Sequence, residues 1–182
     1  MMKIRRKHIR ALVTQILDSH GIRKPPVNVF DLAKRIGLIV SFQQNDDDTL
    51  SGFLFRDSNS GQAIVGVNAG HHENRQRFTI AHEIGHFLLH NTSHEVHVDK
   101  RFVLHRRDQN SSQGTDPHER EANFFAAELL MPESMVRADL AKDFVYDLGE
   151  TESNSIAQLA NRYQVSLAAM SYRLASLGYI EI

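Results

Sequence analysis

The chain has 182 residues, 41% of them hydrophobic and 24% charged, which suits one globular domain with a real core, or one domain with a small appendage. Its 21 Lys and Arg nearly balance its 22 Asp and Glu, so no net positive field attracts nucleic acid or an anionic membrane. The chain has no cysteine, which excludes disulfides and thiolate-bound zinc, and any zinc must therefore use His, Asp or Glu.

The N-terminus, MMKIRRKHIRALVTQIL, is basic and then apolar, but it lacks the long apolar core and the small-residue cleavage site of a signal peptide. No stretch approaches the length of a transmembrane helix. We therefore expect a cytoplasmic protein without a membrane partner.

The first part of the chain predicts two helices and a strand. Apolar residues at helical spacing predict a helix over residues 5–20, which Gly21 ends. A short helix from Asn28 to Ile36 and a strand from Leu38 to Phe42 follow. The run QQNDDDT after them lacks the alternation and glycine spacing of a calcium-binding loop, so we interpret it as a solvated turn.

The middle of the chain predicts a hairpin followed by a long helix. Apolar runs at Ser51–Arg56 and Gln62–Asn68 flank DSNSG, a hairpin signal, and a helix extends from about His72 to His90. The segment 91–117 is polar apart from Phe102–Leu104, which could form a strand. A segment this long without clear structure is usually functional or mobile.

The last part of the chain is expected to be helical. A strong helix from Glu119 to Met131 stops at Pro132, and a weaker helical pattern covers 133–147. A final helix pair is predicted at Ile156–Tyr163 and Ser166–Leu177.

These elements predict an α+β fold, in which a small mixed or antiparallel sheet packs beside the long helix and the C-terminal part is mostly helical. The linker GETESNS divides the expected domain, residues 1–150, from the helix pair, residues 151–182, which we expect to pack on the same domain.

A metal-binding pattern lies inside the long helix, in the sequence RFTIAHEIGH. His82 and His86 are about one helical turn apart, so both imidazoles project from one face and can bind one zinc ion. Glu83 lies beside His82 on the adjoining face, in the position of a general base that accepts a proton from water at the metal. Gly85 leaves the helix surface open to a closely packed neighbour.

Catalytic zinc usually takes three protein ligands and a water. The better candidate for the third ligand is Glu119, which heads the next helix, and Asn123 four residues later could orient a ligating histidine. Taken alone, Glu119 is more simply interpreted as a solvated acid that the helix dipole favours in the first turn. Glu121 points elsewhere on that helix and is kept as the reserve ligand. His90 lies a full turn beyond His86, too far to share the metal, and is interpreted as a helix-end group or a support for the ligands. Three further histidines fall in the polar segment, where solvation is the simplest interpretation: His94, His97 and His105.

Together, RFTIAHEIGHFLLH and EREANFFAAELLMP resemble the ImmA/IrrE family of zinc-dependent peptidases. The resemblance extends upstream to PPVNVFDLAKRIGLIVSF and downstream to YQVSLAAMSYRLASLGYI, and the segment 91–117 matches least. It implies a zincin-like domain whose third ligand is the first Glu of E-x-x-A-[ND], here Glu119. It also implies a helix-turn-helix repressor as substrate, in a phage, mobile-element or stress-response circuit.

The favoured hypothesis is a zinc endopeptidase in which zinc polarises the peptide carbonyl and Glu83 activates water. The strand at Gln62–Asn68 could offer its edge to an extended substrate, or it could be internal scaffold.

The alternative is a regulatory module that binds protein or DNA and holds a structural or vestigial zinc. The final helix pair has the length of a helix-turn-helix, and DNA binding would need Arg162 and Arg173 on phosphate. That segment is not notably basic and its apolar residues can serve a core, so we expect packing and not DNA binding.

Overall fold

The structure is a computed structural model, and it describes residues 4–44, 49–57, 60–90, 97–99, 116–141 and 152–181. Four strands form one mixed sheet: β1 (Leu38–Gln43), β2 (Gly52–Arg56), β3 (Ala63–Asn68) and β4 (His97–Asp99). Their order is β1-β3-β2-β4, with β1 parallel to β3 and the other two pairs antiparallel. The predicted mixed sheet and the β2–β3 hairpin are therefore confirmed.

Of the two interpretations left open for this strand, the structure supports internal scaffold and contradicts an edge that β3 could offer to a substrate. β3 is paired on both sides, by β1 and by β2, so its backbone groups are already used in the sheet. The hairpin pattern indicates β2 as one partner of this strand. The second partner is β1, which lies about twenty residues upstream in the sequence. Within the described residues, β1 and β4 are the edges of the sheet.

The described residues up to residue 90 form three helices: α1 (Arg6–Ser19), α2 (Val29–Arg35) and α3 (Glu73–Leu89). All three agree with the predicted helices to within a residue or two. The guanidinium of Arg56 on β2 caps the end of α3 by donating to the carbonyl oxygens of Phe87 (2.7 Å) and His90 (3.2 Å). The sheet is thereby fastened to the helix that carries the HEIGH sequence.

Four more helices follow: α4 (Pro117–Leu130), α5 (Glu133–Leu140), α6 (Glu152–Tyr163) and α7 (Leu167–Ser176). α4 begins two residues before the predicted start because Asp116 caps it, accepting a hydrogen bond from the backbone N–H of His118. α5 covers the first half of the predicted helix at 133–147. The rest of that helix, the predicted boundary at residue 150 and the run Phe102–Leu104 lie outside the described residues.

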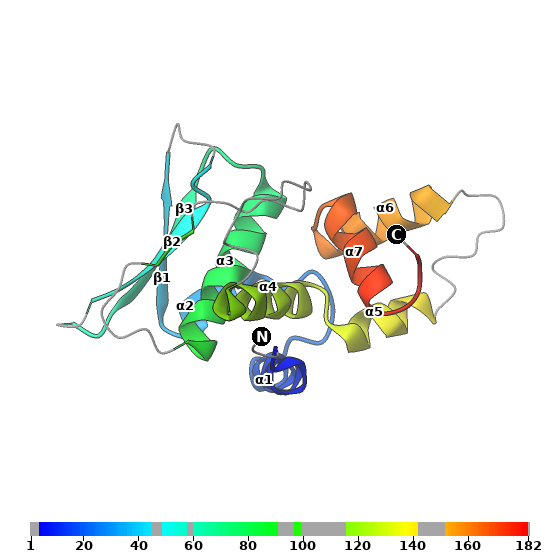
Figure 1. The fold of residues 1–182 in the computed structure, drawn as a ribbon, viewed down its shortest axis with the longest axis horizontal. Helices are drawn as coiled ribbons and strands as arrows, with labels where there is room; N and C mark the ends of the chain where they lie inside the picture. Colours follow the sequence, from blue (N-terminus) through cyan, green and yellow to red (C-terminus); the bar gives the residue numbers. More distant parts are fainter. Residues whose placement is uncertain are drawn as a thin grey trace.

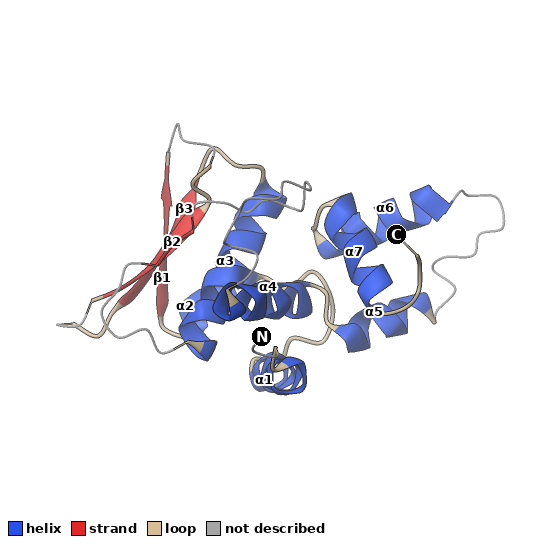
Figure 2. Ribbon diagram, viewed as in Figure 1, coloured by secondary structure: helices blue, strands red, loops and turns tan. Residues whose placement is uncertain are grey.

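The elements form a row, with the sheet at one end and α6 and α7 at the other (Figures 1 and 2). α3 lies beside the sheet, α4 crosses α3, and α1 packs against α4. Buried side chains from α1, the sheet, α3, α4 and the final helix pair belong to one hydrophobic core. No helix within the described residues is long and apolar enough to cross a membrane.

The contact between α3 and α4 is unusually close at Gly85. A Cβ atom there would lie 3.2 Å from the Cα of Ala122 and 3.1 Å from a ring carbon of Phe125. The predicted role of Gly85 is therefore confirmed, since its missing side chain lets α4 approach the face of α3 that bears the histidines.

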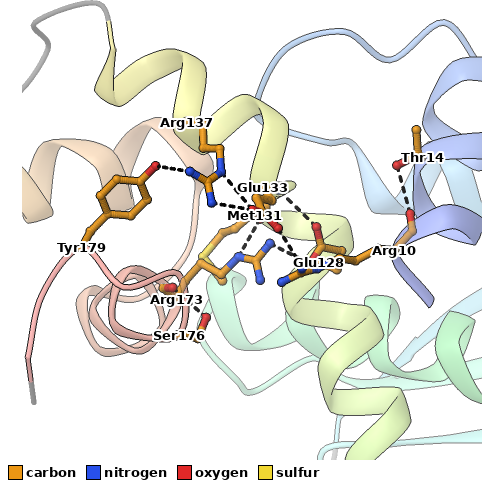
Figure 3. A network of polar contacts seen from close by, with 9 residues as sticks. All are labelled: Arg10, Thr14, Glu128, Met131, Glu133, Arg137, Arg173, Ser176 and Tyr179. Carbon is orange, nitrogen blue, oxygen red and sulfur yellow. Dashed lines mark hydrogen bonds and ion pairs between the residues drawn. The ribbon is translucent and has the colours of Figure 1, made fainter. Parts of the chain in front are cut away.

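The buried Arg173 and the partly exposed Arg10 hold the final helices in place (Figure 3). Arg173 of α7 is 3% exposed and donates to the carboxylate of Glu128 (2.7 Å) and to the carbonyl of Met131 (2.9 Å). Arg10 of α1 reaches Glu128 from the other side, at 3.4 Å, and also pairs with Glu133 at 3.0 Å. One carboxylate on α4 thus joins α1 to α7.

A third arginine, Arg77, ties α3 to the same helix pair. Arg77 donates from Nε to the carbonyl of Gln164 (3.1 Å) and from Nη2 to those of Val27 (3.0 Å) and Tyr163 (3.4 Å). Gln164 has a positive φ of 52°, in the turn between α6 and α7. Burial lowers the pKa of Arg77, and its carbonyl partners make up for part of the lost hydration.

Candidate metal centre

Three side chains converge where α4 crosses α3. The Nε2 atoms of His82 and His86 lie 3.0 Å apart, and the carboxylate of Glu119 lies 3.4 Å from the first and 3.2 Å from the second. These are the three residues predicted as metal ligands, and one ligand atom from each lies within 4.8 Å of the others. Their role as ligands stays a prediction.

The spacing fits a small tetrahedral cation. Two ligand atoms at the usual 2.0–2.1 Å from a tetrahedral zinc ion would be about 3.3 Å apart. The three separations between ligand atoms here run from 3.0 to 3.4 Å. Two imidazoles and one carboxylate are also a donor set that suits zinc. Nothing in this arrangement requires a side chain to move far before a metal binds.

The orientation of His82 agrees with such a site. Its Nδ1 lies 2.9 Å from Oδ1 of Asn123, one turn along α4 from Glu119. Because an amide oxygen only accepts hydrogen bonds, Nδ1 of His82 carries the proton, and Nε2 keeps its lone pair for the metal. The structure thus brings Asn123 to the position predicted for a residue that orients a ligating histidine.

His86 is backed by a different set of groups. Its Nδ1 lies 3.1 Å from Nδ1 of His90, and Nε2 of His90 lies 3.3 Å from the carboxylate of Glu121. Glu121 in turn receives hydrogen bonds from the backbone N–H and the guanidinium of Arg5, at 2.5–3.2 Å. His90 therefore lies behind a proposed ligand, as predicted, and the structure groups Glu121 with His90 and Arg5, apart from the three converging side chains.

The charges around Glu121 follow from these contacts. The hydrogen bonds from Arg5 lower the pKa of the Glu121 carboxyl to about 2, against the opposing effect of burial, so this acid is ionised at neutral pH. Burial lowers the pKa of His90, which keeps that imidazole neutral, although its hydrogen bond to Glu121 acts the other way.

Glu83 follows His82 directly on α3, and its side chain is fully buried. A glutamate is almost never completely buried without a specific reason, so its position is consistent with a role at the site. His82 and His86 are also at most 3% exposed, whereas the Glu119 side chain is 18% exposed. The site is therefore nearest to solvent on the side of Glu119.

Two neighbours of the site were not predicted. Arg5 lies 116 residues before its partner Glu121, and no local pattern in the sequence indicates that pairing. His118 stacks on His90 with ring centroids 4.4 Å apart, and its position next to Glu119 at the start of α4 could have indicated it. Of the three histidines in the polar segment, His94 and His105 lie outside the described residues, and only the strand at His97 is described.

Comparisons with known proteins point to a family of metallopeptidases. The family model for the IrrE N-terminal-like domain of the Peptidase M78 family matches residues 33–175. The metallopeptidase ImmA of Bacillus subtilis (strain 168) is 28% identical over 177 residues, covering 94% of this chain and 87% of that protein. Immunity region protein 2 of Bacillus phage phi105 is 25% identical over 158 residues, 87% of this chain and 90% of that protein.

A solved structure of a Mycobacterium tuberculosis transcriptional regulator shares the fold, with a TM-score of 0.62 and 18% identity. It covers 93% of this chain, which spans just under half (46%) of the length of the regulator. Since the family model alone matches far more than half of the residues, this chain belongs to the ImmA/IrrE family of metallopeptidases.

Proposed function

We propose that this protein is a zinc-dependent endopeptidase. The observation that carries the proposal is the convergence of His82, His86 and Glu119, with separations between ligand atoms of 3.0–3.4 Å, in a chain of a metallopeptidase family. A zinc ion bound there would polarise the scissile carbonyl and make water acidic enough to lose a proton near neutral pH.

The residues of the chain divide the remaining tasks. Glu83 accepts the proton of the attacking water and passes it to the leaving amine, the usual work of a general acid–base residue. Asn123 and His90 hold the two imidazoles by their outer nitrogens, so that both inner nitrogens face Glu119. The close α3–α4 contact at Gly85 fixes the distance between the histidines and that carboxylate.

The proposed substrate is a helix-turn-helix repressor. The proposal draws on the resemblance of the chain to ImmA/IrrE peptidases and on its similarity to a protein named for a phage immunity region. The substrate would be a protein encoded near the gene for this chain, in a phage, mobile-element or stress-response circuit.

The alternative, DNA binding by the final helix pair, has less support. Arg173 is 3% exposed and bound to Glu128 and Met131, so it does not reach a phosphate without leaving the core. Arg162 is paired with Asp139 at 2.8 Å. Both arginines that DNA binding would need therefore serve the packing of the helices.

The direct test uses the purified protein, zinc and the repressor encoded beside it. We expect zinc-dependent cleavage, and we expect Glu83→Gln to retain zinc while losing about 10²–10⁴-fold in rate, because Gln is nearly isosteric but accepts no proton. His82→Ala is the matched contrast and should lose metal and cleavage together. Wild-type rates in Glu83→Gln would remove the general-base role and favour a structural zinc.

A further inference from the structure

We propose that His90, Glu121 and Arg5 form a positioning relay that sets the proton and the ring orientation of His86. The relay consists of the contacts from His86 to His90, from His90 to Glu121 and from Glu121 to Arg5. None of its three members belongs to the group of converging ligand atoms. The inference rests on the metal centre of the proposed function and assigns residues that act on it through His86.

The first step of the argument concerns the proton on His86. Its Nε2 lies 3.2 Å from Glu119 and 3.0 Å from Nε2 of His82, so this is the nitrogen that faces the metal position. A ligating nitrogen carries no proton, so the neutral ring must carry its proton on Nδ1. That N–H points to Nδ1 of His90, 3.1 Å away.

The second step follows from the first. If His86 donates, Nδ1 of His90 accepts, and the proton of the neutral His90 ring lies on Nε2. Nε2 faces the carboxylate of Glu121 at 3.3 Å, and a carboxylate can accept that proton's hydrogen bond. The opposite arrangement would place a proton on Nε2 of His86, where a metal has to bind, and a lone pair of His90 against the Glu121 carboxylate. Only the first arrangement leaves Nε2 of His86 unprotonated and gives the Glu121 carboxylate a hydrogen bond from His90.

The third step concerns the end of the relay. The Glu121 side chain is 1% exposed, and it receives the backbone N–H of Arg5 at 3.0 Å and the Arg5 guanidinium at 2.5 Å. Arg5 is the residue directly before α1, and its own side chain is 47% exposed. The carboxylate that accepts the hydrogen bond from His90 is therefore held in place by the N-terminal segment of the chain.

The two proposed histidine ligands are thus held in different ways. His82 has a neutral acceptor, Asn123, on the same helix as Glu119. His86 has a neutral imidazole backed by a carboxylate, and that carboxylate depends on a residue more than a hundred positions away in the sequence. Partners of this kind typically contribute 10–100-fold to metal affinity.

The test is the zinc dissociation constant of the full chain, measured by competition with a chromophoric chelator, together with the visible spectrum of the cobalt-substituted protein. His90→Phe removes the acceptor for His86 and should weaken zinc binding 10–100-fold. Glu121→Gln leaves a neutral group in place of the carboxylate and should weaken it about 10-fold. Both should change the cobalt spectrum, because the ligand field at the metal changes when the ring of His86 is free to turn.

A conservative variant and a matched control distinguish positioning from folding. His90→Asn places an amide oxygen close to the original Nδ1, so zinc affinity should return to within a few-fold of wild type. Glu128→Gln changes a second buried glutamate of α4 that is also paired with arginines, but at the other end of the helix. It should reduce the stability of the protein and leave the zinc dissociation constant and the cobalt spectrum unchanged.

The outcomes separate the relay from the proposed function. Wild-type zinc affinity and an unchanged cobalt spectrum in folded His90→Phe and Glu121→Gln would overturn the relay and leave the metal centre standing. If His90→Phe does not fold, Glu121→Gln and Arg5→Ala decide in its place, and wild-type affinity in both would overturn the relay. A wild-type chain that binds no zinc would overturn the relay and the proposed function together.

Discussion

The two ends of α4 carry glutamates in opposite kinds of surroundings. Near its start, Glu119 lies against the imidazoles of His82 and His86, at 3.2–3.4 Å. Near its end, Glu128 lies against the guanidinium groups of Arg10 and Arg173, at 3.4 Å and 2.7 Å. The same residue type on one helix thus lies against two imidazole rings in one place and against permanent cations in the other.

These surroundings imply different roles for the two ends of α4. Arginine is always charged, so Arg10 and Arg173 balance the negative charge of the Glu128 carboxylate. These ion pairs join the helices. A neutral imidazole supplies a lone pair and no charge, so the proposed function has the group around Glu119 completed by an added cation. We therefore expect substitutions at the start of α4 to change the affinity for zinc, and substitutions at its end to change the stability of the protein. The predictions below test that division.

The largest expected effect is on metal binding at the start of α4. Glu119→Ala removes one of three proposed protein ligands, and because a zinc site is worth about 10–16 kcal/mol, the loss should be roughly 3–5 kcal/mol, or about 10²–10⁴-fold in affinity. Glu121→Ala should retain zinc with a smaller loss, since it acts only through His90. Metal analysis of both variants after dialysis checks this. Loss of zinc by Glu121→Ala and retention by Glu119→Ala would show that the reserve acid is the ligand.

The next effect is on stability at the end of α4. Arg173→Met removes one partner of a buried ion pair and leaves Glu128 and the Met131 carbonyl with fewer donors, which should cost about 3–5 kcal/mol. Urea denaturation of the metal-free protein measures this. The zinc affinity of the folded fraction should not change. A loss below about 1 kcal/mol would mean that Arg10 alone is enough to neutralise Glu128.

The smallest expected effect is at Gly85, where α3 and α4 are in close contact. Gly85→Ala places a methyl group 3.1–3.2 Å from Ala122 and Phe125, so α3 and α4 must separate by a few tenths of an ångström. Overpacking of this kind costs about 1–3 kcal/mol, and the better helix propensity of alanine offsets up to about 1 kcal/mol. Zinc affinity should fall several-fold because Glu119 moves away from the histidines.

Gly178→Ala provides the control for that variant. Gly178 has a φ of +80° and lies beyond α7, so alanine there should destabilise the protein through backbone strain without affecting the metal. If Gly85→Ala binds zinc as tightly as Gly178→Ala does, the close helix contact does not set the geometry of the site.

The sequence predicts the local parts of this molecule well. Helical periodicity locates α1 to α4, and the four-residue spacing of His82 and His86 places both rings on one face of α3. E-x-x-A-N does the same for Glu119 and Asn123, because that spacing is also one helical turn. In each of these cases the relevant neighbours are close in sequence, so a local rule is enough.

The parts that could not be predicted depend on distant neighbours. The second partner of β3 is β1, which the hairpin pattern does not indicate, and so the strand offered as an edge is in the centre of the sheet. The pairing of Arg5 with Glu121 spans 116 residues, and neither residue carries a pattern that points to the other. The burial of Arg173 also depends on how α7 packs, which a helical pattern alone does not specify.

The hydrogen bonds of Arg77 have a mechanical consequence. Arg77 precedes His82 by five residues on α3, or about 7.5 Å along the helix axis, and it holds the turn between α6 and α7 through the carbonyl groups of Gln164 and Tyr163. A force that pulls the final helix pair away from the body of the protein would load this guanidinium as well as that of Arg173, and through Arg77 it would reach the helix that bears both histidines. The final helix pair and the candidate metal centre are therefore connected through the side chain of Arg77. We expect a partner protein that binds α6 or α7 to act on α3 through these hydrogen bonds.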